Sequence, residues 1–360
     1  MRGIVYNEKE LRVVDSLTVR DPRPGEVRIQ IVRAGVCHSD VSVVNGTIPF
    51  PTPVVLGHEG AGIVMELGEG VNGLAVGDHV VISTLGNCGA CSACDSGQPT
   101  HCRATFGKLS APFKLDGERA FQFANIGAFA EETVVKAGQA VKIHPEVPFE
   151  VASLLGCGVI TGVGAVFNRA KVGHGQSAVV IGVGGIGLNV IQGLALSDAL
   201  PIIAIDANPK KRDLALQFGA THFIDASVLD ADGVAAAVKE LCPNGVDYAF
   251  ECVGHPALIR QSIDMLDWGG TCVILGVPKL GTEANFMVHG LYNDKTIMGC
   301  RYGAGRPHKD IPLFVDLYRA GRLKLDELVT RTYPMADIQQ TLDDMHNGDL
   351  ARGVLEVTSV

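Results

Sequence analysis

The segment that decides the fold is Leu155-Gly156-Cys157-Gly158-Val159-Ile160-Thr161-Gly162, near the middle of a chain of 360 residues. Before this segment, cysteines and histidines stand at spacings typical of metal ligands. After it, a short apolar strand leads into a glycine-rich loop. We therefore interpret the segment as a junction between two domains. There Cys157 would hold a metal for the first half, while the next turn contacts a cofactor bound by the second.

Length and composition favour a globular protein of two domains. The chain is too long for one core, and 47% hydrophobic against 19% charged residues argues against disorder. A formal net charge of −9 disfavours nucleic acid or an anionic membrane as partner, because both need clustered lysine and arginine. We also expect no apolar run of membrane-spanning length and no signal peptide at the start. These expectations indicate a cytoplasmic protein whose ten cysteines are metal ligands or buried side chains.

Residues 1 to about 157 have the pattern of a β-rich domain. The run Gly25–Arg33 alternates apolar and polar residues, and Gly77–Ile82 resembles a further strand. Closely spaced strands with glycine turns predict a barrel-like antiparallel arrangement.

The strongest local motif is a set of four cysteines within 15 residues: Cys88, Cys91, Cys94 and Cys102. Four thiolates suit a closed tetrahedral zinc site, which leaves no position for a substrate and would brace its loop. An iron–sulfur cluster is a weaker alternative, because bacterial cluster motifs place the fourth cysteine sooner, with a proline after it. Redox chemistry and simple packing are further alternatives.

A second metal site is less evident from spacing. Taken alone, His58 is more typical of a satisfied buried histidine, and Cys37 of a small buried apolar residue. Together with Cys157 they supply Cys, His and Cys, the ligand composition of an open catalytic zinc whose fourth position takes water or substrate. The spacing leaves open whether the three converge.

The second half carries a dinucleotide-binding pattern. The apolar run Ser177–Ile181 leads into Gly182-Val183-Gly184-Gly185-Ile186-Gly187, a G-x-G-x-x-G match that opens an apolar helix. A second strand ends in Asp206, at the expected distance to bind an adenosine ribose hydroxyl. That carboxylate would repel a 2′-phosphate, which favours NAD, while the basic run at 210–212 keeps NADP open. Continued alternation of strands and helices predicts an α/β, doubly wound parallel sheet.

Taken together, these motifs resemble the zinc-containing alcohol dehydrogenases of the medium-chain dehydrogenase/reductase family. The matching segments are Gly57–Gly62, the four-cysteine loop, Gly156–Gly162 and Gly182–Gly187, and the resemblance covers essentially the whole chain. It implies a β-rich, GroES-like catalytic domain of residues 1–158 and 302–360, and a Rossmann cofactor domain of 159–301. It also implies NAD, two zinc ions per chain, and a homo-oligomer. We favour a dimer over a tetramer because the loop from residue 102 to 123 is long, which resembles the dimeric members of the family more than the shorter tetrameric ones.

The resemblance also assigns roles to individual residues. Those implied in catalysis are the zinc ligands Cys37, His58 and Cys157 and the nearby Ser39, Asp40 and Glu59. The structural zinc ligands implied are Cys88, Cys91, Cys94 and Cys102. Ser39 would bind the substrate oxygen, and Asp40 would orient the histidine. The cofactor contacts implied are His38, Thr161, Gly182, Gly184, Gly185, Ile186, Gly187, Asp206, Lys211 and Arg352. The substrate pocket implied is lined by Ile48, Thr84, Phe123 and Ala124.

One position departs from the family pattern. Many relatives end a proton relay on a histidine where this chain has Ser42, so we assign no terminal general base. The chemistry implied is reversible hydride transfer between NAD and a primary, secondary or aromatic alcohol, giving an aldehyde or ketone. Zinc would lower the pKa of the bound hydroxyl.

Two alternatives compete with this interpretation. The first, within the family, is a thiol-dependent formaldehyde dehydrogenase, which oxidises the hydroxymethyl adduct of a thiol such as glutathione. Such an enzyme needs cations for the adduct's carboxylates, and Lys108, Lys114 and Arg119 are candidates, although loop charges are usually solvated. The second is a zinc-bearing binding module for nucleic acid or protein. The negative net charge of the chain and the lack of interleaved basic and aromatic residues near the cysteine loop argue against such a binding module.

Overall fold

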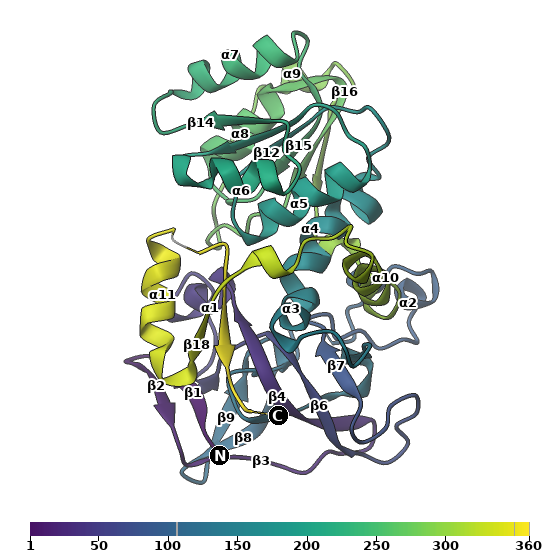
Figure 1. Ribbon diagram of the computed structural model, residues 1–360, viewed down its shortest axis with the longest axis vertical. Helices are drawn as coiled ribbons and strands as arrows, with labels where there is room; N and C mark the ends of the chain where they lie inside the picture. The colour runs from purple at the N-terminus through teal and green to yellow at the C-terminus, as the bar shows by residue number, and fades with distance from the viewer. Residues whose placement is uncertain (106, 349, 360) are drawn as a thin grey trace. The chain divides into compact units, whose positions relative to one another are not determined.

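The computed structural model describes residues 1–105, 107–348 and 350–359 (Figure 1). The chain divides into two compact units. The first contains Met1–Cys157 together with Arg306–Val360, and the second contains Gly158–Gly305. The last 55 residues of the numbering therefore return to the unit formed by the first half.

The first unit is built on two mixed sheets, so the predicted antiparallel arrangement is wrong for two strand pairs, which run parallel. One sheet has the strand order β2-β1-β5-β9-β8-β3. Its strands are β1 (Gly3–Tyr6), β2 (Leu11–Val14), β3 (Leu17–Val19), β5 (Val54–Val55), β8 (Ser110–Leu115) and β9 (Glu118–Gln122). Neighbouring strands run antiparallel except β5 and β9.

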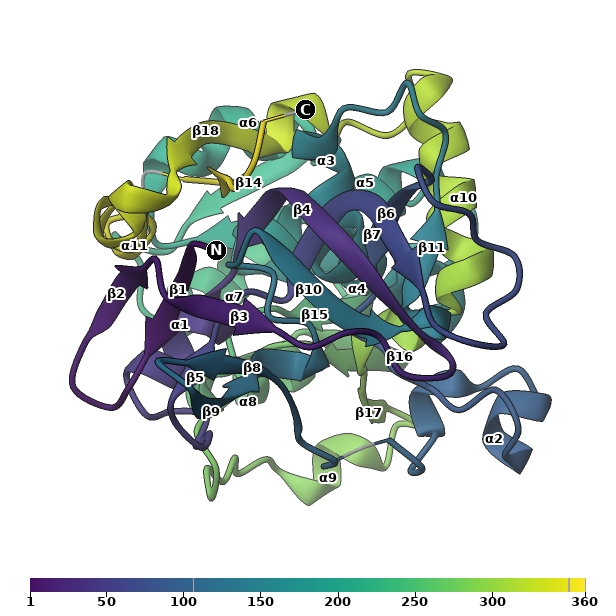
Figure 2. The same cartoon turned by 90° about the horizontal axis from the view of Figure 1, so that it is seen from below.

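The second sheet of this unit has the order β11-β7-β6-β4-β19-β18, with β10 also paired to β4. Its strands are β4 (Glu26–Val36), β6 (Glu59–Leu67), β7 (His79–Ile82), β10 (Glu132–Lys136), β11 (Ala140–Lys142), β18 (Val329–Pro334) and β19 (Arg352–Glu356). The predicted strand at Gly25–Arg33 is confirmed by the long strand β4, which is labelled with β6 in Figure 2. Strand β4 pairs with β6 on one side and with β10 and β19 on the other. The helices of the unit are α1 (His38–Val44), α2 (Ser92–Asp95), α3 (Phe149–Leu154), α10 (Pro307–Arg319) and α11 (Ile338–His346).

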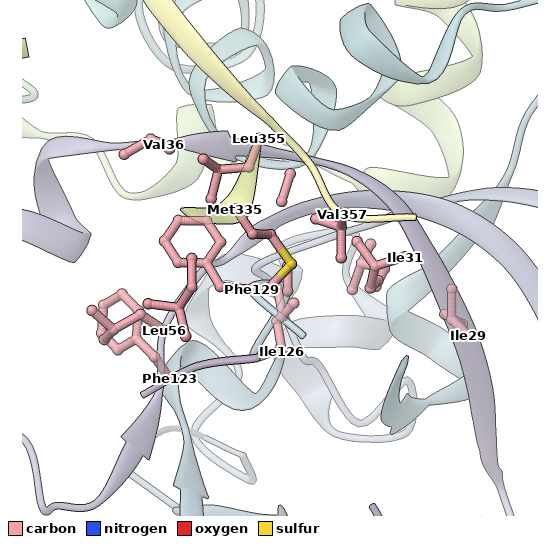
Figure 3. Packing of buried hydrophobic residues seen from close by; sticks show 14 of the residues in the cluster. Ile29, Ile31, Val36, Leu56, Phe123, Ile126, Phe129, Met335, Leu355 and Val357 are labelled. Carbon is pink, nitrogen blue, oxygen red and sulfur yellow. The ribbon is translucent and has the colours of Figure 1, made fainter. Parts of the chain in front are cut away.

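The main core of this unit explains why the C-terminal segment belongs to it. Ile29 and Ile31 on β4 are fully buried, as the period-two pattern requires. Met335, Leu355 and Val357 pack into the same cluster from the other end of the chain (Figure 3). Burying such a side chain stabilises the fold by roughly 1.5–3 kcal/mol, so the tail contributes directly to the stability of the first unit.

The second unit is a parallel sheet of six strands in the order β14-β13-β12-β15-β16-β17. Numbered along the chain, this is the order 3-2-1-4-5-6 of a Rossmann fold, which confirms the predicted doubly wound sheet. The strands are β12 (Ala178–Ile181), β13 (Ile202–Asp206), β14 (His222–Asp225), β15 (Val246–Glu251), β16 (Leu266–Ile274) and β17 (Thr296–Gly299). The helices are α4 (Ile160–Gly164), α5 (Gly185–Leu196), α6 (Arg212–Gln217), α7 (Ala231–Leu241), α8 (Pro256–Asp264) and α9 (Val288–Leu291).

The expectation of no apolar stretch of spanning length was wrong for one segment. The helical run Phe149–Ala170 is 22 residues long and apolar enough to cross a bilayer by length and composition. However, 89% of its apolar window is buried inside the protein, as in the core helix of a soluble protein. The run owes its apolar character to this burial, so it is weak evidence for a membrane.

Candidate metal centres and cofactor site

Three separate segments of the first unit bring a metal-binding cluster together. Cys37 follows β4 and caps α1, His58 immediately precedes β6, and Cys157 lies in the π-helical turn Leu155–Val159. The ligand atoms of these three residues and of Glu59 all lie within 4.8 Å of one another, and all four residues are buried. The cluster therefore has the donor set of a zinc site, with two thiols and an imidazole.

Local helix geometry positions the partner of His58. Asp40 is the third residue of α1, and its carboxylate accepts the backbone N–H of Cys37 at 3.2 Å, as in a capping box. The same carboxylate accepts the backbone N–H of Gly57 at 2.9 Å and lies 3.2 Å from Nδ1 of His58. A buried carboxylate thus orients the imidazole through one ring nitrogen.

The other ring nitrogen of His58 is the observation that most directly suggests a metal. Nε2 is buried, and within the described part of the chain it has no hydrogen-bond partner. Buried polar atoms in folded proteins are nearly always satisfied, so this nitrogen needs a ligand. A metal ion between Nε2 and the two thiol groups would supply it.

The electrostatics of the cluster favour thiolate formation. A hydrogen bond from Cys157 is the main cause that holds the pKa of Cys37 well below its usual value. Burial of the thiol raises this pKa, but the charges of His58 and Arg352 lower it further. Burial opposes protonation of His58, but the negative charges of Asp40 and Cys37 outweigh it and raise the pKa of the ring well above its usual value. Thiolate is the form of cysteine that binds metal.

Behind the cluster lies a buried ion pair. Arg352 on β19 donates to the carboxylate of Glu59, and the two side chains are 6% and 0% exposed. A Cβ atom at Gly35 would collide with this carboxylate, so glycine is required there. The guanidinium balances the charge of Glu59 and holds it in place. The implied contact of Arg352 with a cofactor pyrophosphate stays a prediction.

One aromatic ring packs directly against His58, and a second packs against the first. The ring of Phe123, a predicted pocket residue, packs edge-on against His58 with centroids 5.3 Å apart, and Phe50 packs edge-on against Phe123 at 5.4 Å. Ile48 and Ala124 are partly buried against the main core cluster of the first unit. Phe50 was missed by the sequence analysis, although an aromatic residue between Pro49 and Pro51 was a usable signal.

Thr84 and the segment that carries Cys157 are joined by a hydrogen bond. The Thr84 hydroxyl donates to the Gly156 carbonyl at 3.0 Å. A Cβ atom at Gly156 would collide with the carbonyl of Ile82 at the end of β7, so this glycine lets the helix approach the strand closely. Of the other residues implied near the metal, Ser39 is half-buried in the first turn of α1, whereas His38 is exposed.

The four loop cysteines form the second cluster, and their Sγ atoms also lie within 4.8 Å of one another. The Sγ atoms of Cys91 and Cys94 are 3.6 Å apart, as are those of Cys88 and Cys102. A disulfide would need about 2.05 Å, whereas zinc with bonds of about 2.3 Å to four thiolates places them about 3.8 Å apart. The backbone N–H of Cys88 is the main cause that lowers the pKa of Cys102 to about 6. The cluster fits a closed tetrahedral zinc.

In the second unit, the glycine-rich loop connects β12 to α5. Gly182 has a φ of 91°, which favours glycine, and a Cβ atom at Gly187 would collide with the carbonyl of Gly182. The helix begins at Gly185, so its free N–H groups and positive dipole end are available to an anion such as a pyrophosphate. Ile186 is half-buried in the first turn, and Thr161 is buried in α4.

Asp206 ends β13 beside this loop. Its carboxylate accepts the backbone N–H groups of Val183 at 2.7 Å and Asn208 at 2.8 Å, and Nζ of Lys211 lies 3.1 Å away. The predicted ribose-binding carboxylate is therefore held against the glycine-rich loop and is paired with the predicted Lys211. The structure brings Gly182, Gly184, Asp206 and Lys211 into one local arrangement.

Comparisons with known proteins agree in naming one family. Residues 23–145 match the model of the alcohol dehydrogenase GroES-like domain, and residues 185–320 match that of the zinc-binding dehydrogenases. An S-(hydroxymethyl)glutathione dehydrogenase from Synechocystis is 40% identical over 357 residues, which cover 96% of each chain. An alcohol dehydrogenase class-3 from Cereibacter sphaeroides is 36% identical over 363 residues, again 96% of each. The crystal structure of benzyl alcohol dehydrogenase from Acinetobacter calcoaceticus superposes with a TM-score of 0.93 at 34% identity, over 99% of both chains.

Proposed function

We propose, from the premise that this chain belongs to the zinc-containing alcohol dehydrogenase family, that it oxidises a primary or secondary alcohol reversibly with NAD. The observation that carries the proposal is the buried Cys37, His58 and Cys157 cluster with an unpartnered Nε2. Cys37, His58 and Cys157 would hold a zinc ion, whose Lewis acidity would lower the pKa of an alcohol hydroxyl by several units, and bound NAD would take up the hydride from the alcohol carbon.

The chain's own residues would orient the reactants and handle the proton. Asp40 fixes the imidazole of His58, and the pairing of Glu59 with Arg352 keeps that carboxylate from becoming a further metal ligand. We assign uptake of the hydroxyl proton to Ser39, in the first turn of α1. With serine at position 42, the proton passes on without a histidine as terminal base.

The names of the relatives change the order of the candidate substrates. The sequence motifs favoured alcohols in general first and a thiol adduct second, whereas the relatives at 36–40% identity are mostly named S-(hydroxymethyl)glutathione dehydrogenases. We therefore propose S-(hydroxymethyl)glutathione, itself a primary alcohol, as the first substrate to test. Benzyl alcohol is a second candidate, supported by the benzyl alcohol dehydrogenase neighbour and by the ring of Phe123, which packs against His58 and is itself contacted by Phe50.

The test is NADH absorbance with the purified, zinc-loaded protein. Formaldehyde would be supplied with and without glutathione, and benzyl alcohol would be supplied separately. Strict dependence on glutathione supports the adduct as substrate, and turnover of benzyl alcohol alone supports the aromatic alternative. A zinc-loaded, NAD-binding protein that oxidises no alcohol of either kind would contradict the proposal.

We also propose NAD rather than NADP, and two zinc ions per chain. The support is the Asp206 carboxylate at the end of β13, which would repel a 2′-phosphate, and the two groups of clustered ligand atoms. Comparison of kcat/KM with the two cofactors tests the first point. Metal analysis of the purified protein tests the second, with two zinc ions per chain expected and one contradicting it.

A homodimer in the cytoplasm completes the proposal. Strand β17 is an edge of the parallel sheet, and large apolar side chains are exposed in the same unit, with Trp268 77% and Tyr292 85% exposed. Edge strands and exposed apolar patches are typical of interfaces. Ten cysteines without a disulfide suit a reducing compartment. Light scattering should give twice the chain mass, and a monomer at micromolar concentration would contradict the dimer.

A further inference from the structure

The first unit contains a cavity of about 490 Å³ that belongs to neither metal cluster. Its walls come from the start of β4, from β8, β9 and β10, and from the segment that follows the cysteine loop. Its volume lies within the range of about 300–1,000 Å³ that small-molecule sites occupy. Five cationic side chains and one carboxylate line it: Arg20, Arg23, Lys108, Arg119, Lys136 and Glu26.

Most of this positive charge is uncompensated. Arg20 and Glu26 form a two-pronged ion pair, with N–O distances of 2.6 and 2.8 Å. The charge of Arg23 also acts on Glu26, and Lys136 stands opposite Glu26 in the β4–β10 pair. Five cations therefore share one carboxylate, which leaves four positive charges in excess. The chain as a whole carries a formal charge of −9, so an excess of four positive charges around one concavity is not a consequence of composition. A concave surface of one charge sign concentrates ions of the opposite sign.

The walls that carry these cations are fixed. The Asn125 side chain accepts the backbone N–H of Ser110 at 2.9 Å and donates to the carbonyl of Lys108 at 3.0 Å, which fixes the backbone of the loop that presents this lysine. The guanidinium of Arg119 lies 4.9 Å from the ring centroid of Phe121, a cation–π contact that engages its face and leaves its in-plane N–H donors available.

The floor of the cavity is also rigid. Gln122 is 1% exposed, and its amide donates to the carbonyls of Ile126 and Val134 and to the hydroxyl of Thr133. Gln139 is 2% exposed and donates to the carbonyl of Ser83. The cations therefore converge on a space whose shape is set by buried hydrogen bonds.

We propose that this cavity binds a small multivalent anion, one that carries several phosphate or carboxylate groups. Several anionic groups are needed because the cations that make up the excess charge stand on different walls of the cavity. Among the described residues, its lining includes none of the clustered cysteines, His58 or the implied pocket residues. Lys108 and Arg119, which the sequence analysis considered for the carboxylates of a thiol adduct, thus belong to a second site, and the inference does not depend on the proposed substrate.

Calorimetry on the full-length, zinc-loaded protein tests the inference, with NAD at saturation so that the cofactor site does not take up the probe. The probes are inorganic tripolyphosphate and citrate, in separate titrations. The test variant is Lys108→Gln combined with Lys136→Gln. The matched control is Lys114→Gln, a nearby exposed lysine on β8 that does not line the cavity.

We expect the unsubstituted protein to bind at least one probe and the double variant to bind it about tenfold or more weakly, while the control stays within about twofold. Tighter binding of tripolyphosphate identifies phosphate groups as the preferred ligand, and tighter binding of citrate identifies carboxylates. Absence of binding to the unsubstituted protein, or equal binding by all three proteins, would overturn the inference. If the double variant does not fold, as judged by its circular dichroism, Arg23→Gln alone replaces it.

Discussion

Replacement of Asp40 by asparagine tests how the buried carboxylate controls metal binding. The two side chains have nearly the same shape, so packing is conserved while one acceptor becomes a donor. One carboxylate oxygen accepts the Cys37 N–H, and the other accepts the Gly57 N–H and lies against Nδ1 of His58. In either orientation of the asparagine, its NH₂ group must face at least one of these N–H donors.

The magnitude follows from the lost contact. A hydrogen bond to a charged group contributes about 1.5–3 kcal/mol, and this site is 1% exposed, so solvent screens it little. If the carboxylate orients His58 for zinc, Asp40→Asn should weaken zinc binding at the Cys37, His58 and Cys157 cluster by about 10- to 150-fold. The zinc of the four-cysteine loop should be unaffected.

The assay is competition with a chromogenic chelator, followed by metal analysis and NADH formation. We expect the variant to retain one zinc ion per chain at a chelator concentration that leaves two in the unsubstituted protein. Asp95→Asn is the control, because its exposed side chain lies in α2 beside the cysteine loop. Wild-type zinc retention and activity in Asp40→Asn would refute the argument that Asp40 holds His58 for the metal.

Four further perturbations test other parts of the molecule. Cys91→Ser should release the loop zinc and lower the melting temperature while the cluster at His58 keeps its metal; retention of two zinc ions would count against the loop site. Leu355→Ala should reduce the free energy of unfolding by about 2–5 kcal/mol, measured in urea, because its side chain is fully buried, and a change below 1 kcal/mol would contradict its place in the core. Asp206→Gly should shift the kcat/KM ratio towards NADP, since it removes the carboxylate that would repel a 2′-phosphate, and an unchanged ratio would argue against that role. Hydrogen bonds, above all the one from Tyr333, lower the pKa of Asp344. The contribution of Asp344 to the free energy of unfolding is therefore present above about pH 4 and lost as the pH falls through its folded-state pKa. Asp344→Asn should make the free energy of unfolding less dependent on pH in that acid range, and an unchanged pH dependence would disprove this role.

Local patterns made the second unit largely predictable. The run before Gly182 is apolar because β12 is buried on both faces. Gly182 is favoured by its positive φ, and Gly187 is required by the nearby carbonyl of Gly182. Asp206 is the last residue of β13, and its distance along the chain from the glycine-rich loop is set by the Rossmann fold. Such constraints act over short stretches of chain, so they are visible in the sequence.

The region around Cys157 was less predictable. Its sequence indicated only a junction between two domains, whereas Phe149–Ala170 is helical with two π-helical stretches. Gly156 is there for close approach to Ile82 rather than for flexibility. The ion pair of Glu59 with Arg352 joins residues 293 positions apart, and no periodicity signals such a contact.

The most direct test of the account is a crystal structure of the NAD-bound protein with anomalous data collected at the zinc edge. The account predicts an anomalous peak bound by Sγ of Cys37, Nε2 of His58 and Sγ of Cys157, at about 2.0–2.3 Å, with the fourth position taken by water or substrate. A peak absent from this cluster, or a fourth bond from Glu59 that closes the site, would contradict it.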